Sequence, residues 1–175
     1  VQRVRTGEIL AMASRPAFDP NQFHYGDPDQ RRNRAVTHLY EPGSTFKVAI
    51  LAAALNEGLV EPDTPVDCER GRWIHGGRAL HDHHPYGELT VADVLKKSSN
   101  IGAAKIALRL GEERLEAYMR DFGFGEPTGV ELPAEARGIV HSRSSWSAIS
   151  MTRIAMGHEV AVTGLQMLNA VAAIV

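Results

Sequence analysis

The chain has 175 residues, of which 43% are hydrophobic and 23% are charged, a balance typical of a folded globular domain and unlike that of a disordered chain. Its 19 basic and 21 acidic side chains leave a formal charge of -2, so no strong positive field would draw it to nucleic acid. The longest apolar stretches, near residues 48–55 and 164–175, are shorter than the roughly 20 residues that a membrane-spanning helix needs.

The first part of the chain predicts a hairpin followed by a long loop. Residues 1–4 and 8–13 flank Arg5-Thr6-Gly7 as two strands would flank a turn. Residues 15–34 are rich in Pro, Asp, Asn and Arg and lack periodicity, which predicts a surface loop.

Helices dominate the rest of the predicted structure. Apolar residues and alanines over residues 44–56, followed by Gly58, predict a strongly buried helix with a glycine at its C-terminal end. Thr90 and Asp93 match a capping box that begins a short helix toward Lys97. Further helices are expected over residues 101–110, over residues 115–122 and from near Thr163 onward, and residues 123–147 are expected to be irregular.

These elements predict an α+β fold with one domain over residues 1–175. Residues 72–83 predict a hairpin that turns at Gly76-Gly77, within a small insertion spanning residues 66–88. A lone two-stranded hairpin is marginally stable, so residues 1–13 need partner strands that this chain does not visibly supply. We therefore expect the domain to be incomplete at its C-terminal end.

The segment Ser44-Thr45-Phe46-Lys47 could carry nucleophilic chemistry. A serine hydroxyl needs a neighbouring base, and a spacing of three on a helix brings a lysine amine within its reach. Unpaired N–H groups at the helix N-terminus would also favour negative charge on an attacked carbonyl oxygen. Lysine normally titrates near 10.4, so Lys47 must be desolvated or lie near another cation to act as a base. The alternative is that Ser44 only caps a helix and Lys47 is solvated.

A second segment, Ser98-Ser99-Asn100, lies between two predicted helices. A hydroxyl followed two residues later by an amide can relay a proton and bind a peptide group of a substrate. The alternative is a simple helix cap, because Ser and Asn are favoured there.

Together the two segments resemble the motifs of penicillin-binding proteins, and most closely the transpeptidase domain of the monofunctional class B, cell-division or elongation type. The segments 6–14, 18–21, 41–47, 89–91 and 98–105 are similar to that domain in the same order. The resemblance implies the penicillin-binding and serine β-lactamase-like fold, in which a helical cluster packs against an antiparallel sheet. By this resemblance, we expect the C-terminal strands of that sheet to be missing from this chain.

The resemblance also implies a D,D-transpeptidase that cross-links peptidoglycan stem peptides through a serine acyl-enzyme and is a target of β-lactams. Ser44 would be acylated, Lys47 would take its proton, Ser98 would relay that proton to the leaving amine, and Asn100 would hold Lys47 and the substrate amide. No cofactor or metal is expected. Other cell-wall synthesis proteins are expected partners, and the parent protein is expected in the inner membrane with this domain on the extracytoplasmic side.

The third motif of the family, a Lys or His followed by Ser or Thr and Gly, is absent. The nearest strings are rejected because of their position or their missing cation: Arg5-Thr6-Gly7, Pro127-Thr128-Gly129 and Val162-Thr163-Gly164. The isolated chain is therefore expected to acylate poorly. A second departure is Met156-Gly157-His158-Glu159, where many relatives have Tyr-Gly or Gly-Tyr-Gly.

Other functions remain open as alternatives. A D,D-carboxypeptidase or a serine β-lactamase would use the same motifs, although Glu112 to Glu116 lacks the Asn of the class A deacylating segment. A non-catalytic module of the same fold is a further alternative, supported only by the missing third motif.

Two other groups of residues receive less weight. His75, His81, His83 and His84, with Asp82, could suggest a zinc site, but no Cys or second spaced pair completes a tetrahedral set, so we interpret them as surface residues. Cys68, the only cysteine, has acidic neighbours that would raise its pKa, which argues against a thiol nucleophile.

Overall fold

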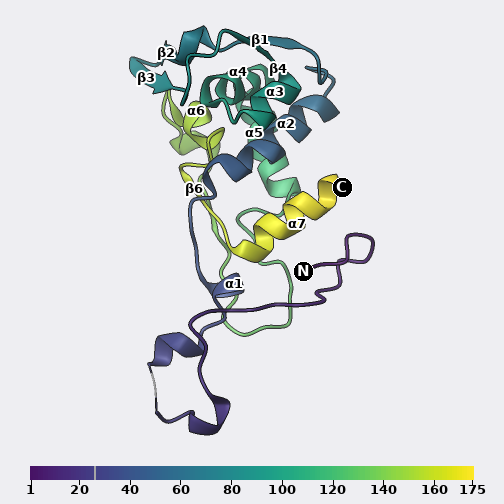
Figure 1. The fold of residues 1–175 in the computed structure, drawn as a ribbon, viewed down its shortest axis with the longest axis vertical. Coiled ribbons are helices and arrows are strands. Elements are labelled where there is room, and N and C mark those ends of the chain that lie inside the picture. Colours follow the sequence, from purple (N-terminus) through teal and green to yellow (C-terminus); the bar gives the residue numbers. More distant parts are fainter. Residues whose placement is uncertain (26) are drawn as a thin grey trace.

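The computed structural model describes residues 1–25 and 27–175 and shows a helical body from which an arm projects (Figure 1). The α-helices are α1 (Arg34–Thr37), α2 (Lys47–Asn56), α3 (Val91–Lys96), α4 (Asn100–Leu110), α5 (Glu112–Asp121), α6 (Ser150–Ile154) and α7 (Gly164–Ile174). The strands are β1 (Pro65–Asp67), β2 (Arg72–His75), β3 (Arg78–His81), β4 (Glu88–Thr90), β5 (Ile139–Val140) and β6 (Val160–Ala161). Short 3-10 turns cover Pro20–Gln22, Pro28–Arg31, Gly43–Phe46, Glu69–Gly71 and Arg143–Ser145. The predicted α+β class is confirmed, and the strands pair two by two in antiparallel fashion.

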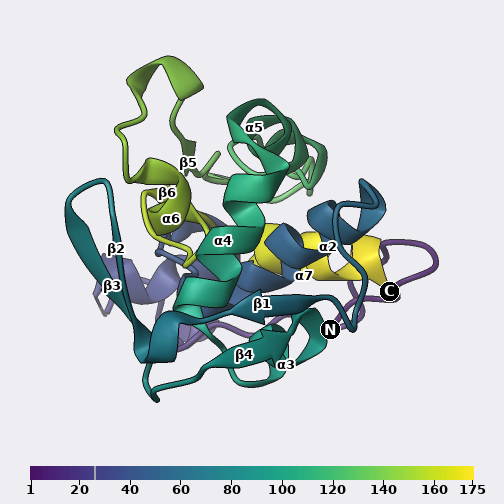
Figure 2. The same ribbon diagram turned by 90° about the horizontal axis from the view of Figure 1, so that it is seen from above.

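Helix α4 runs through the middle of the body, and α2 packs against it (Figure 2). Both helices bury small side chains, among them Ala53 in α2 and Ala103 and Ala107 in α4, and small side chains allow helix axes to approach closely. The rings of Phe46 and Phe124, whose centroids are 5.0 Å apart, fill the core beside them. This packing brings the first turn of α2 to the N-terminal end of α4.

The predicted helix over residues 44–56 is present, but its first turn is a 3-10 turn and the α-helix proper begins at Lys47. Its C-terminal end matches the prediction. Gly58 has a φ of 63° and donates its N–H to the carbonyl of Leu55, while the N–H of Leu59 reaches the carbonyl of Ala54, each at 3.0 Å. These two bonds form a Schellman motif, which needs a residue that tolerates positive φ.

Two strand pairs lie within residues 65–90, with β2 and β3 between β1 and β4 in the sequence. The predicted hairpin is confirmed, because β2 pairs with β3 and the turn lies at Gly76 and Gly77, with φ values of 55° and 76°. Strands β1 and β4 were not predicted, since three residues are too few to show an alternating pattern. They pair with Val66 opposite Leu89 and bring the two ends of the segment together. That this segment is an insertion into a single domain of residues 1–175 remains a prediction.

The later helices agree with the sequence patterns. The expected helices over residues 101–110, over 115–122 and from near Thr163 correspond to α4, α5 and α7. Thr90 Oγ1 accepts the N–H of Asp93 at 3.1 Å, which is the first half of the predicted capping box. Helix α6 and strands β5 and β6 were not predicted, because each is five residues or shorter. None of the helices in the described part of the chain is long and apolar enough to cross a membrane.

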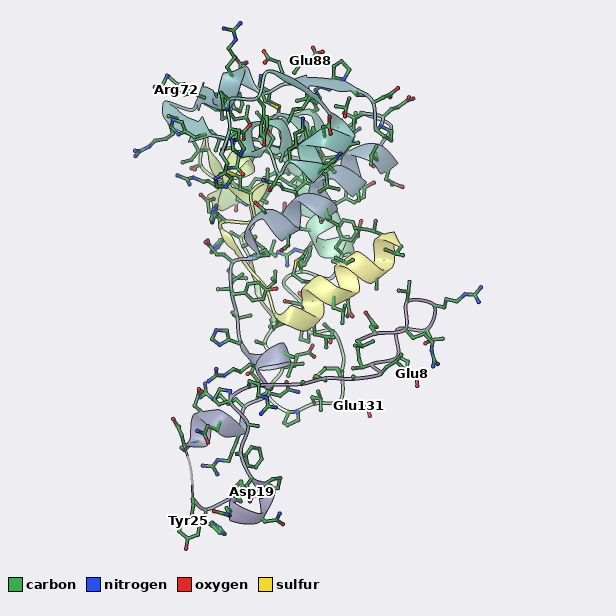
Figure 3. The ribbon with its side chains drawn as sticks, viewed as in Figure 1. Glu8, Asp19, Tyr25, Arg72, Glu88 and Glu131 are labelled. Atoms are coloured by element: carbon green, nitrogen blue, oxygen red, sulfur yellow. The ribbon has the colours of Figure 1, made fainter. Side chains whose placement is uncertain are left out.

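The predicted strands over residues 1–4 and 8–13 are wrong as strands. Gln2 and Ile9 form an isolated antiparallel bridge, and the backbone around it turns as a hairpin without extended pairing. Two strands alone gain too little to extend. The predicted loop forms the arm, which holds Asp19 and Tyr25 far from Arg72 and Glu88 on the body (Figure 3). Residue 26 of this loop lies outside the described residues.

Candidate active site

The serine and the lysine of the first motif lie one turn apart at the start of α2. Ser44 belongs to the 3-10 turn and is exposed, whereas Lys47 begins the α-helix and is fully buried. The Nζ atom of Lys47 lies 3.1 Å from Oγ of Ser44, so the predicted contact is confirmed. The positive end of the α2 dipole lies beside this exposed hydroxyl, where it favours negative charge.

Three further oxygen atoms surround the amine of Lys47. Ser98 presents its carbonyl oxygen at 2.7 Å and its Oγ at 2.9 Å, and Oδ1 of Asn100 lies at 2.7 Å. These contacts exclude the alternative in which Lys47 is solvated. Ser99 is the residue that caps α4, through an N–H···Oγ bond of 2.9 Å from Gly102, which leaves the side chains on either side of it to face Lys47.

These contacts suit a neutral amine. The carbonyl oxygens of Ser98 and of the Asn100 amide can only accept hydrogen bonds, and they use both N–H groups of a neutral lysine. The lone pair then remains for the hydroxyl of Ser44 or of Ser98, each of which can donate a proton. Burial lowers the pKa of Lys47 to about 8, and the carboxylate of Asp82 acts in the opposite direction. The amine is thus able to serve as a general base near neutral pH.

Ser98 has an unusual backbone conformation for a residue with a side chain. Its φ is 56°, in the left-handed region that few residues other than glycine adopt. It connects the end of α3 to the cap of α4, and in this conformation both its carbonyl and its hydroxyl reach the same amine. Such local strain persists only where the surrounding contacts hold it in place, and it often occurs at functional sites.

The amide of Asn100 is oriented by a contact on its other side. Its Nδ2 donates to the carbonyl oxygen of His81 at 2.9 Å, so its Oδ1 must face Lys47. Asn100 therefore presents an acceptor to the amine, as the resemblance implied for its contact with Lys47.

The unusual segment 156–159 packs directly behind the nucleophile turn. Gly43 donates its N–H to the carbonyl of Gly157 at 3.2 Å, and a Cβ on Gly157 would collide with the backbone of Gly43. His158 Nδ1 lies 2.8 Å from one carboxylate oxygen of Glu41, and the N–H of Glu159 donates to the other at 3.0 Å. The hydrogen bond with His158 is the main reason that the pKa of Glu41 lies below its usual value.

Asp82 is a site residue that the sequence patterns did not reveal. Its carboxylate accepts hydrogen bonds from Ser99, Asn100 and Ile101 at the start of α4. In the sequence it stands among histidines and is distant from the motif, so nothing local links it to Ser98-Ser99-Asn100. The one feature of the sequence that could have pointed to Asp82 is its position as a carboxylate at the end of a predicted hairpin.

The three strings that resemble the missing third motif have other contacts. Thr6 lies in the turn of the N-terminal hairpin, where the backbone N–H groups of Thr6 and Gly7 donate to the carbonyl of Arg3. Thr128 donates to Glu135 at 2.5 Å, and Thr163 caps α7 in a full capping box with Gln166. These positions agree with the rejection of all three strings as the third motif.

The remaining candidates from the sequence are the histidines around Asp82 and the lone cysteine, Cys68. His81, His83 and His84 are exposed, and among the described residues no three His, Cys, Asp or Glu side chains gather closely enough to hold a metal ion. Cys68 is fully buried, and burial is the main cause that raises the pKa of its thiol, ahead of the acidic neighbours considered from the sequence.

The geometry agrees with what comparison with known proteins shows. The family model described as the penicillin binding protein transpeptidase domain matches residues 1–175. The chain is 34% identical over 170 residues to the probable peptidoglycan D,D-transpeptidase PenA of Neisseria gonorrhoeae, covering 97% of this chain and 29% of that protein. It is 35% identical over 171 residues to the peptidoglycan D,D-transpeptidase FtsI of Escherichia coli strain K12, covering 98% and 29%. The chain thus spans less than a third of the length of these relatives.

Solved structures give the same result. The transpeptidase domain of penicillin-binding protein 3 from Burkholderia pseudomallei, in its apo form, matches with a TM-score of 0.79 and 33% identity, over 81% of this chain and 43% of that one. Penicillin binding protein 3 of Mycobacterium tuberculosis complexed with aztreonam matches with a TM-score of 0.76 and 35% identity, over 81% and 32%. The chain belongs to the penicillin binding protein transpeptidase domain family.

Proposed function

We propose that the intact protein is a D,D-transpeptidase that cross-links peptidoglycan stem peptides through an acyl-enzyme on Ser44. One observation carries this proposal. An exposed serine hydroxyl lies 3.1 Å from a buried lysine amine whose pKa burial lowers to about 8. A buried, partly neutral amine beside an accessible hydroxyl is the arrangement that activates a serine nucleophile.

In the first half of the reaction, Oγ of Ser44 attacks the carbonyl carbon of the penultimate D-alanine while Nζ of Lys47 accepts the hydroxyl proton. Ser98 Oγ, 2.9 Å from Nζ, passes a proton to the nitrogen of the terminal D-alanine. The C–N bond breaks, free D-alanine leaves, and an ester on Ser44 remains. Asn100 holds Lys47 through Oδ1 and offers its amide to the substrate peptide.

In the second half, an amine of a neighbouring stem peptide attacks the ester carbon. The proton of that amine returns to Oγ of Ser44 through Ser98 and Lys47, the ester bond breaks, and an amide cross-link forms. A β-lactam would acylate Ser44 in the same way, and its opened ring would stay on the serine as an ester. The aztreonam complex of the Mycobacterium tuberculosis relative supports this expectation.

The cell-wall substrate also implies the surroundings of the protein. Peptidoglycan is cross-linked outside the cytoplasmic membrane, so we propose that this domain works on the extracytoplasmic side of an inner-membrane protein. Other cell-wall synthesis proteins are its proposed partners. The names of the relatives PenA and FtsI support a role in peptidoglycan synthesis.

A fluorescent penicillin tests the proposal in the intact protein. We expect a lasting covalent adduct on Ser44, located by peptide mapping, and no adduct on Ser44→Ala. Ser145→Ala, which changes another exposed serine, should label as the wild type does. A donor and acceptor stem peptide should then yield a cross-linked product. Rapid release of the drug would indicate a β-lactamase, release of D-alanine without cross-linking a carboxypeptidase, and no adduct a non-catalytic module; each of these would overturn the proposal.

A further inference from the structure

The carboxylate of Asp82 binds the residues that follow Ser98. Its Oδ1 accepts the backbone N–H of Asn100 at 2.5 Å and that of Ile101 at 3.0 Å, and its Oδ2 accepts the hydroxyl proton of Ser99 at 2.7 Å. These N–H groups belong to the first turn of α4, where they have no partner inside the helix. Asp82 thus satisfies them from another element, and its negative charge suits the positive end of the α4 dipole.

Asp82 is itself held rigidly. It follows β3 directly, and its backbone N–H donates to the carbonyl of Gly71 at 3.1 Å. Gly71 has a φ of 83°, and a Cβ there would lie 2.8 Å from the carbonyl oxygen of His84 and from Cα of Pro85. Gly71 therefore contacts the chain both at Asp82 and at the residues that follow it, His84 and Pro85. The carboxylate is therefore a firm support for α4.

Two neighbouring residues fix both parts of Asn100. The carboxylate of Asp82 holds its backbone N–H, and the carbonyl of His81 holds its side-chain Nδ2. Ser98, with its strained φ of 56°, immediately precedes the residues that Asp82 holds. Because the chain is held at Ser99 and Asn100, the position of Ser98 against Lys47 depends on the same support.

We infer that Asp82 is a positioning residue for acylation of Ser44: it holds Ser98 and Asn100 where their oxygen atoms meet the amine of Lys47. This inference rests on the proposed function and deepens it. Asp82 does not touch Lys47 or the reacting atoms in the contacts above. It acts through the α4 N-terminus and through its charge.

The charge of Asp82 gives the inference a signature that a purely structural role lacks. Its carboxylate opposes the effect of burial on Lys47 and favours the charged amine. The buried thiol of Cys68 is a further ionisable group close to Asp82. That thiol also has Asp67 and Lys105 as charged neighbours, and Lys105 is paired with Glu69 at 2.6 Å. The adjacent His81 and His83 are exposed. Removal of the Asp82 charge should therefore make Lys47 easier to deprotonate.

Two substitutions separate position from charge. Asp82→Asn keeps an oxygen acceptor for both N–H groups, and its amide can donate to Ser99 Oγ, so the geometry is preserved while the charge is lost. Asp82→Glu keeps the charge, but the added methylene displaces the carboxylate. Asp93→Asn is the matched control, because it removes a partly exposed carboxylate whose ion pair with Lys97 is long, at 3.9 Å.

The experiment measures the second-order rate of Ser44 acylation by fluorescent penicillin between pH 6 and 9 in the intact protein. For Asp82→Asn we expect the rising limb of the rate to move to lower pH. For Asp82→Glu we expect the acylation rate to fall on the order of 10- to 100-fold at all pH values, because misplacement by about 1 Å has effects of this size. The pH at which the rate rises should stay near its wild-type value. Asp93→Asn should match the wild type in both respects.

The outcomes separate the inference from the proposed function. Suppose that the wild type labels on Ser44 and that both Asp82 variants acylate at the wild-type rate with the wild-type pH profile. The inference is then wrong and the proposed function stands. If the variants only melt earlier, and their folded fraction acylates with the wild-type profile, Asp82 is structural and the inference is again wrong. If the wild type itself does not label, the proposed function fails and the positioning role fails with it.

Discussion

Lys47 and Asn100 meet across 53 positions of the sequence, with Nζ of the lysine donating to Oδ1 of the amide at 2.7 Å. The contact joins the first residue of α2 to the first residue of α4. It makes the lysine part of a network in which, among the described residues, each oxygen atom that hydrogen-bonds to Nζ comes from one of the two motifs. The reactivity of Ser44 therefore depends on how two helix ends are held together.

The pH dependence of acylation should report the pKa of Lys47. The base is the neutral amine, and the neutral fraction grows as pH rises through a pKa of about 8. About 10% of the amine is neutral at pH 7 and about 90% at pH 9, against less than 0.1% at pH 7 for an unshifted lysine. We expect the rate of Ser44 labelling to rise from pH 6 to 9 with a midpoint near 8.

Lys47→Arg is the test of that assignment, since it keeps the positive charge on a slightly longer side chain that cannot lose its proton. We expect labelling to fall by at least about 100-fold and the rising limb to vanish, because general-base assistance contributes roughly that much or more. A variant that kept both the rate and the limb would show that another group is the base.

Asn100→Asp should slow acylation by placing a negative charge 2.7 Å from Nζ of Lys47. That charge would favour the protonated amine, so the limb of the pH profile should move to higher pH. Asn56→Asp makes the same change at the other end of α2, where the side chain bonds Tyr118, and should leave the profile unmoved. An unchanged profile in Asn100→Asp would contradict the contact.

Gly157→Ala should disturb the nucleophile turn. The backbone at Gly157 has a φ of 77°, and the added methyl group would collide with the backbone of Gly43, one residue before Ser44. Gly58→Ala is the control, because its φ is 63° but nothing lies within 4 Å of the added Cβ. Gly58→Ala should cost about 1–2 kcal/mol of conformational strain, and Gly157→Ala clearly more.

Denaturant unfolding and penicillin labelling would measure these effects in both glycine variants. Gly157→Ala should also label at least several-fold more slowly, while the folded Gly58→Ala protein labels normally. Equal behaviour of the two variants would mean that the contact between Gly43 and Gly157 has no influence on Ser44.

Gln166→Leu should destabilise the fold without touching the site. Gln166 is 1% exposed, and its Nε2 donates to the carbonyls of Glu126 and Arg137, each at 2.8 Å. Its Oε1 also accepts the N–H of Thr163. Leucine fills a similar volume but leaves these groups unpaired, so the free energy of unfolding should fall by about 2–4 kcal/mol.

Gln22→Leu, on the exposed arm, is the comparison for this substitution and should change the free energy of unfolding little. Urea unfolding of both variants gives the measurement. A loss below about 0.5 kcal/mol in Gln166→Leu would show that the three backbone groups find other partners.

The sequence by itself determined the local features of this protein. The pair Ser44 and Lys47 is encoded by a spacing of three, and the glycine that ends α2 and the cap at Thr90 are encoded by adjacent residues. Each depends on contacts within one or two helical turns, so periodicity and capping rules suffice to find it. The shortest elements escaped these rules: strands β1 and β4 and helix α6 are too short to show a pattern.

Only the tertiary structure decided how the motifs work together. Ser98 and Lys47 are 51 positions apart, and Glu41 and His158 are 117 apart, so their contacts result from the packing of whole elements. The lowered pKa of Lys47 likewise follows from burial, to which every surrounding element contributes. Asp82 shows the same principle, because its three hydrogen bonds exist only once β3 lies against the start of α4. Adjacent residues cannot encode such contacts, since their geometry is set by the packing of the core.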